Sequence, residues 1–313
     1  MDRIIGKFGG EIQGALVLVF GALHGNEPAG VRALEAVFQM LQHEFDNNPN
    51  FFFYGKLVGI LGNRQAYRAG QRFIEEDLNR QWTSENVNRI EHSDRNALTA
   101  EDLEIAELLK VIKQEIREAE PEVMILLDLH TTSAGGGIFC IPTDENNSLR
   151  LAKQLSAPVV LNLFEGVEGT LLRYAADGHF ETGGLPRRTY GAAFEAGQHD
   201  EPFSVSRAIA GIINCLRAAG CIHQADMLNE YEAVLMEYSN SLPKVTRLRH
   251  VHRIRPGDEF RMRPGYANFQ PVQLGEHLAD DVSGTVLSPF DGLILMPLYQ
   301  SKGYDGFFIV EEM

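Results

Sequence analysis

Short runs of consecutive apolar residues recur along the first two thirds of the chain, and the segments between them carry apolar residues at helical spacing. The runs are near-continuous rather than alternating, which is typical of strands that are covered on both faces. They predict six buried strands, at residues 15–20, 56–61, 123–128, 138–141, 159–163 and 192–195.

Three helices are predicted between or after these strands, over residues 99–118, 202–219 and 223–238. The first has the clearest boundaries, because Thr99 and Asp102 have the spacing of a capping box and Pro121 follows its end. Strands that alternate with helices indicate an α/β fold. We therefore expect a mixed, mostly parallel sheet flanked by helices.

The pattern changes after about Asn240. Helical periodicity disappears, and short alternating segments are separated by turn signals such as Pro-Gly at 256–257 and 264–265 and Asp-Gly at 291–292. This predicts two units, a catalytic domain over residues 1–240 and a small all-β domain over residues 241–313.

Composition narrows the possible partners and location. The 313 residues include 28 Lys and Arg against 43 Asp and Glu, a net charge of −15, which argues against a nucleic-acid or anionic membrane surface. The first ten residues do not resemble a signal peptide. Three cysteines without C-x-x-C spacing are typical of a reducing compartment, so we expect a cytoplasmic protein.

A candidate metal site begins directly after the first predicted strand. His24 and Glu27 are three residues apart, a spacing that puts both side chains on one face if a helix begins there. His130 lies at the end of another predicted strand, and open α/β sheets place ligands at such strand ends. Two histidines and one glutamate would leave an open position for water on one zinc ion, as catalytic zinc sites do.

Each of these motifs is weak alone, since a histidine after a strand is often a hydrogen-bonded polar residue rather than a ligand. The glycines around His24 and the Asp128-Leu-His130 segment at a strand end favour the metal interpretation. Asp128 could orient His130 or could line the pocket.

Further polar residues could complete a catalytic site. Asn79 and Arg80 have the chemistry to hold a carboxylate, and Arg72 could stabilise an oxyanion, although surface ion pairs with the nearby acidic residues would explain the arginines equally well. Glu195 ends another predicted strand and could serve as general base, with a structural bond to the backbone as the alternative.

In order along the chain, H-G-N-E at 24–27, D-L-N-R at 77–80, D-L-H at 128–130 and E-x-G at 195–197 resemble the motifs of the succinylglutamate desuccinylase/aspartoacylase family. The motifs extend over more than half of the chain. The resemblance implies a zinc-carboxypeptidase-like fold and a homo-oligomer such as a dimer.

The resemblance also implies a role for each matching residue. His24, Glu27 and His130 would hold zinc, Arg72 would polarise the scissile carbonyl, and Glu195 would be the general base. The implied substrate-binding residues are Asn79, Arg80, Tyr299 and one of Arg187 and Arg188, the last pair as contacts of a second substrate carboxylate.

These observations predict a zinc-dependent hydrolase of an N-acyl amino acid of the acetyl or succinyl type. A zinc carboxypeptidase that acts on peptides is the alternative within the same chemistry. A metal- or metabolite-binding protein without activity is the alternative from another class.

Overall fold

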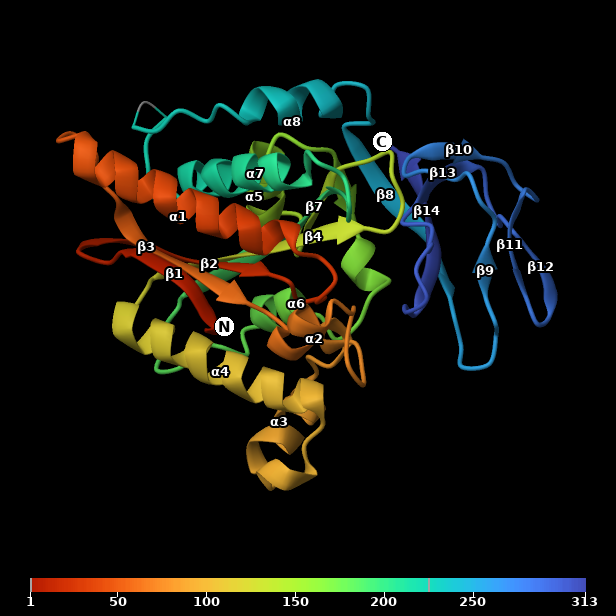
Figure 1. Ribbon diagram of the computed structural model, residues 1–313, viewed down its shortest axis with the longest axis horizontal. Helices are drawn as coiled ribbons and strands as arrows, with labels where there is room; N and C mark the ends of the chain where they lie inside the picture. The colour runs from red at the N-terminus through yellow and green to blue at the C-terminus, as the bar shows by residue number, and fades with distance from the viewer. Residues whose placement is uncertain (1, 225) are drawn as a thin grey trace.

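One mixed sheet runs through the whole molecule. The structure, a computed structural model, describes residues 2–224 and 226–313. Eleven of its strands form this sheet in the order β1-β3-β2-β4-β7-β5-β6-β8-β14-β13-β10, with β2, β3, β4 and β7 parallel to one another near one end (Figure 1). The strands are β1 Ile4–Gly9, β2 Ile12–Gly21, β3 Tyr54–Leu61, β4 Val123–Thr132, β5 Phe139–Pro142, β6 Val159–Leu161, β7 Arg188–Gln198, β8 Val245–Arg253, β10 Gln270–Val272, β13 Gly292–Leu295 and β14 Asp305–Glu312.

Helices cover both faces of this sheet. α1, α5, α7 and α8 lie on one face, and α2, α3, α4 and α6 lie on the other (Figure 1). Their bounds are α1 Ala29–Asn47, α2 Arg64–Ala69, α3 Ser84–His92, α4 Ala100–Ala119, α5 Asn147–Gln154, α6 Leu171–Ala176, α7 Ser204–Ala218 and α8 Glu232–Ser239, with 3-10 turns at Leu78–Arg80, Arg95–Ala97 and Leu163–Glu165. Among the described residues, no helix combines the length and the apolar character needed to cross a bilayer.

The buried apolar runs behave as their pattern predicts. Each of the six predicted strands overlaps an observed one, and alternate side chains enter the two helix-covered layers: Val17 and Val19 pack toward α1, whereas Leu16 and Leu18 pack toward α4. The predicted capping box of α4 is present, with Thr99 and Asp102 each accepting the other's backbone N–H.

The helix predicted over residues 223–238 is wrong in its first half. Of the residues described there, only those of α8, Glu232–Ser239, are helical. Before it, Asp226 accepts the backbone N–H of His223, and Asn229 donates to the carbonyl of Ala210 on α7. Local side-chain bonds of this kind compete with helix formation, so the described residues of this segment form a loop against α7.

Some C-terminal strands extend the main sheet, and others form a separate small sheet. β8 pairs in parallel with β6 and antiparallel with β14, and a separate three-stranded sheet contains β9 Arg261–Met262, β11 His277–Asp281 and β12 Gly284–Leu287. The prediction of a mixed sheet flanked by helices, with a small β unit at the C-terminus, is confirmed. The proposed boundary near residue 240 falls between α8 and β8 and is not a break in the sheet.

Candidate metal centre

The candidate metal-site residues lie at the ends of two neighbouring parallel strands. β2 and β4 are paired with Phe20 opposite Asp128, so the chain beyond β2 and the last residues of β4 meet at one sheet edge. His24 and Glu27 lie in a turn closed by the bond from Glu27 N–H to the His24 carbonyl, 3.1 Å. The expectation that they share a helical turn is wrong, because α1 begins after Pro28, at Ala29.

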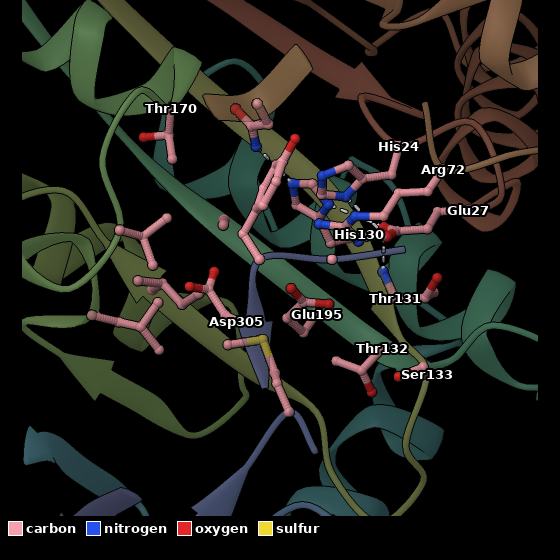
Figure 2. A pocket seen from close by; sticks show the side chains of 18 of the residues that line it. His24, Glu27, Arg72, His130, Thr131, Thr132, Ser133, Thr170, Glu195 and Asp305 are labelled. Carbon is pink, nitrogen blue, oxygen red and sulfur yellow. Dashed lines mark hydrogen bonds and ion pairs between the residues drawn. The ribbon is translucent and has the colours of Figure 1, made fainter. Parts of the chain in front are cut away.

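The side chains of His24, Glu27 and His130 converge at this edge of the sheet (Figure 2). Their candidate ligand atoms all lie within 4.8 Å of one another. The two Glu27 oxygens are each 3.0 Å from an imidazole Nδ1, Oε1 from His24 and Oε2 from His130. The Thr131 backbone N–H also donates to Oε2, 3.0 Å, which fixes the carboxylate between the two rings.

Two further carboxylates hold the outer nitrogens of the imidazoles. His24 Nε2 lies 3.1 Å from Asp77 Oδ1, and His130 Nε2 lies 2.7 Å from Asp128 Oδ2. A carboxylate on Nε2 keeps the proton there in a neutral imidazole, which leaves the Nδ1 lone pair free. The donor set therefore fits a metal ion bound by two Nδ1 atoms and Glu27.

The titration of these groups reflects the same contacts. Burial by itself would lower the pKa of His130, but the carboxylates of Asp128 and Glu27 outweigh it and raise that pKa well above its usual range. Burial would raise the pKa of Glu27, but His24 and His130 hold it well below its usual range. Both shifts share one cause, which is the close contact of Glu27 with the imidazole of His130.

Close backbone packing explains the glycine in this turn. A Cβ on Gly25 would lie 2.1 Å from the Ala66 carbonyl carbon, so only glycine lets the turn reach α2. Gly25 N–H donates to the carbonyl of Arg72, 3.0 Å, which ties the turn to the loop that carries Arg72. Arg72 in turn donates from Nε and Nη2 to Asp77 Oδ2, and its Nη1 is 3.6 Å from Glu27 Oε1. The arginine is therefore part of the site and not a surface ion pair.

Glu195 lies opposite His130 on the adjacent strand β7, so both side chains reach the same pocket. No described residue donates a hydrogen bond to its Oε2, although that atom is buried. Burial raises the pKa of Glu195 to about 8; the charge of His130 opposes the shift, and the carboxylates of Glu27 and Asp128 add to it. This unpartnered oxygen argues against the structural alternative, in which the carboxylate of Glu195 is bonded to the backbone.

Asn79 and Arg80 also line the pocket, but both already have protein partners. Asn79 accepts the Leu171 N–H at the start of α6, 3.0 Å, and donates to Asp128 Oδ2, 3.3 Å. Arg80 donates from Nη2 to Asp305 Oδ2, 2.8 Å. Asn79 thus supports Asp128, and Arg80 faces the pocket as half of an ion pair.

Comparison with known protein families shows which family the chain belongs to. The model of the succinylglutamate desuccinylase/aspartoacylase catalytic domain matches residues 13–183, more than half of the chain. The chain belongs to the succinylglutamate desuccinylase/aspartoacylase family.

Individual members of this family agree with the match. A protein of Nostoc sp. strain PCC 7120 described as a probable aspartoacylase is 33% identical over 125 residues, 40% of this chain and 38% of that protein. The chain thus spans less than half the length of such curated relatives. Among solved structures, the succinylglutamate desuccinylase of Chromobacterium violaceum superposes with a TM-score of 0.62 at 18% identity, covering 98% of this chain and 88% of that one. Murine aminoacylase 3 gives 0.58 at 20% identity, covering 96% of each chain.

Some residues that the family resemblance implied lie elsewhere in this member of the desuccinylase/aspartoacylase family. Arg188 begins β7 and pairs with Val123, seven residues before Glu195, or roughly 23 Å along an extended strand. Arg187 precedes it, and both are exposed at the opposite end of the sheet from the metal cluster. The structure therefore does not bring either arginine to the pocket.

Tyr299 is likewise directed away from the pocket. Its hydroxyl donates to the Arg263 carbonyl, 2.8 Å, and accepts the Tyr266 N–H, 2.9 Å, so the side chain braces the C-terminal β unit. Tyr304 lines the pocket instead, with its ring stacked on Phe73.

Asp305 is a charged pocket residue that the sequence analysis did not predict. It begins β14 and lines the pocket (Figure 2). Its carboxylate pairs with Arg80 and with Arg253 of β8. No motif indicates it, since its partner Arg80 is 225 positions away.

Proposed function

We propose that this chain hydrolyses the amide bond of an N-acyl amino acid, with zinc held by His24, Glu27 and His130. The observation that carries the proposal is Glu195, a buried carboxylate with an unpartnered oxygen in the same pocket as the candidate ligands and Arg72. A purely structural metal site would have no use for such a group.

Two imidazole nitrogens and one carboxylate are a donor set of catalytic zinc sites. When bound, zinc there supplies a Lewis acid that polarises the amide carbonyl and lowers the pKa of water. Asp77 and Asp128 hold the two histidines in the orientation that this requires.

The protein's own groups account for the proton transfers. Glu195 accepts a proton from the attacking water and returns it to the amide nitrogen as the C–N bond breaks. Arg72, held by Asp77, offers its remaining N–H donors to the carbonyl oxygen as negative charge develops there. Arg80 is positioned to receive one substrate carboxylate through the donors that Asp305 does not occupy.

The names of the relatives support amide hydrolysis as the reaction class. They are described as aspartoacylases, succinylglutamate desuccinylases and an aminoacylase. The family membership and the Glu195 geometry point to the same chemistry.

The test combines metal analysis with hydrolysis of a panel of N-acyl amino acids. We expect about one zinc per chain, lost in His24→Ala. Glu195→Gln should keep the metal and lose activity by about 10²–10⁴-fold, the usual contribution of a general base. Glu168→Gln, an exposed glutamate near the pocket, is the matched control and should behave as the unaltered protein.

Other results would favour the alternatives. Turnover of peptides without turnover of N-acyl amino acids would make the protein a carboxypeptidase. Bound zinc with no hydrolysis of either class would make it a binding protein, and full activity in Glu195→Gln would refute the assigned base.

A further inference from the structure

The pocket offers few positive charges to a substrate. Arg72 and Arg80 are the arginines among its described lining residues, and no lysine lines it. Arg72 is bound to Asp77 through two donors, and Arg80 is bound to Asp305. The described lining residues include no further lysine or arginine, and Arg187 and Arg188 lie at the other end of β7.

Asp305 adds a negative charge at the same place. The residue is 9% exposed, and its carboxylate accepts hydrogen bonds from Arg80 on Oδ2 and from Arg253 on Oδ1. Its side chain faces the same space as Glu195 and the candidate metal ligands (Figure 2). Arg80 and Arg253 offset this charge in part, but a second substrate carboxylate placed beside Asp305 would be repelled by it and would find Arg80 already engaged.

Beside the hydroxyl and amide side chains of Thr131, Thr132, Ser133, Thr170 and Gln300, the pocket has an apolar wall. It is formed by side chains from β5, the turn at Leu163–Glu165, the loop after it and the end of the C-terminal sheet: Ile141, Leu163, Phe164, Val167, Met296 and Phe308. A hydrocarbon group gains free energy on such a surface, whereas a carboxylate placed there loses its hydration without finding a partner.

We propose that the substrate carries at most one carboxylate and an uncharged hydrocarbon group next to the scissile amide, and that Asp305 enforces this selectivity. The inference rests on the proposed amide hydrolysis and specifies its substrate class: N-acyl amino acids with an apolar side chain or apolar acyl group. Arg80 holds the single carboxylate, and the apolar wall holds the hydrocarbon group.

Matched substrate pairs test this directly, because leucine and aspartate side chains have similar shape and different charge. The first pair is N-acetylleucine and N-acetylaspartate, and the second is 4-methylpentanoyl-alanine and succinyl-alanine. We expect kcat/KM of the zinc-loaded protein to favour the apolar member of at least one pair by tenfold or more. A preference for the acidic members, with activity present, would overturn the inference and leave the proposed function intact.

Two variants locate the cause of the selectivity. Asp305→Asn releases Arg80 and should raise kcat/KM for the acidic members at least fivefold without raising it for the apolar ones. Met296→Lys places a cation on the apolar wall with a side chain of similar length and should lower the apolar-to-acidic ratio at least tenfold. Met236→Lys, the same change at an exposed position of α8, is the control and should leave the ratio unchanged. An unchanged ratio in both pocket variants would refute the role of this wall and of Asp305.

Binding separates failure of the inference from failure of the proposed function. Calorimetric titration of the zinc-loaded protein with 4-methylpentanoate and with succinate needs no turnover. Tighter binding of 4-methylpentanoate, reversed in Met296→Lys, would support the pocket chemistry even if no amide were hydrolysed. Tighter binding of succinate would contradict it.

Discussion

Each imidazole of the metal cluster depends on one carboxylate outside the ligand set. Asp128 is buried and bonds His130 Nε2 at 2.7 Å, while Asp77 does the same for His24 and also holds Arg72. Asp128 is therefore the simpler position at which to test ligand orientation, because it does not contact the arginine.

We expect Asp128→Asn to weaken zinc binding by about 10–100-fold, since the neutral amide orients His130 less firmly and no longer strengthens it as a ligand. Competition with a chelator of known affinity measures the change. Asp46→Asn, on the exposed side of α1, is the control. Equal affinities for the two variants would show that Asp128 does not orient the ligand.

Glu195 makes the metal-free protein sensitive to alkaline pH. Its pKa is about 8 in the folded state against 4.5 for an unperturbed glutamate, so between these values the folded protein keeps a proton that the unfolded chain releases. The stability gained from this proton is complete below about pH 4.5 and is lost as pH rises toward 8.

Glu195→Gln removes this dependence because its side chain does not ionise. In chelator, the variant should gain stability relative to the unaltered protein on going from pH 5 to pH 9, by at least about 1 kcal/mol. Urea denaturation at the two pH values measures the difference. The prediction fails if the variant and the unaltered protein lose the same stability over this range.

At the scale of elements, helix α4 fixes the conformation of the loop over residues 70–77. Glu101, in the first turn of α4, is buried and accepts the backbone N–H groups of Ile74, Glu75 and Glu76 at 2.8–3.2 Å, with Asn63 Nδ2 as a fourth donor. Charge-assisted bonds to successive N–H groups are strong, so Glu101 fixes the loop that carries Arg72 and Asp77.

We expect Glu101→Gln to speed amide exchange at residues 74–76 at least tenfold and to lower kcat/KM, because Arg72 loses its fixed position. Hydrogen exchange and kinetics measure the two effects. Glu115→Gln is a matched control: it is a buried glutamate of the same helix, but it pairs with Lys7 and Lys56 far from this loop. Should both variants change exchange at 74–76 equally, the effect would be a general loss of stability.

At the scale of the whole molecule, the pocket is shared between the N-terminal and C-terminal parts of the chain. Arg80 and Arg253 meet on Asp305, and Met296, Tyr304 and Phe308 line the same pocket as the metal cluster. β8 also covers the edge of β6, so the sheet has no natural end at residue 240.

A chain ending at residue 240 should therefore not form a stable folded domain. It would expose the edge of β6 and the apolar residues that β14 covers, and such surfaces favour aggregation. Circular dichroism and thermal unfolding measure this. A soluble fragment with a cooperative transition would show instead that residues 1–240 fold independently, as the sequence pattern predicts.

The sequence by itself determined the local features of this protein. Uninterrupted apolar runs specify buried strands, Thr99 and Asp102 specify the start of α4, and the motifs around His24 and His130 indicate the candidate ligands, because each depends on residues close together in the chain. Tertiary structure alone decided what depends on distant contacts. It turned Tyr299 away from the pocket, left Arg187 and Arg188 at the far end of β7, and placed Asp305 on Arg80. The chemistry follows local motifs, whereas the charge of the pocket depends on pairs far apart in sequence, which no spacing rule encodes.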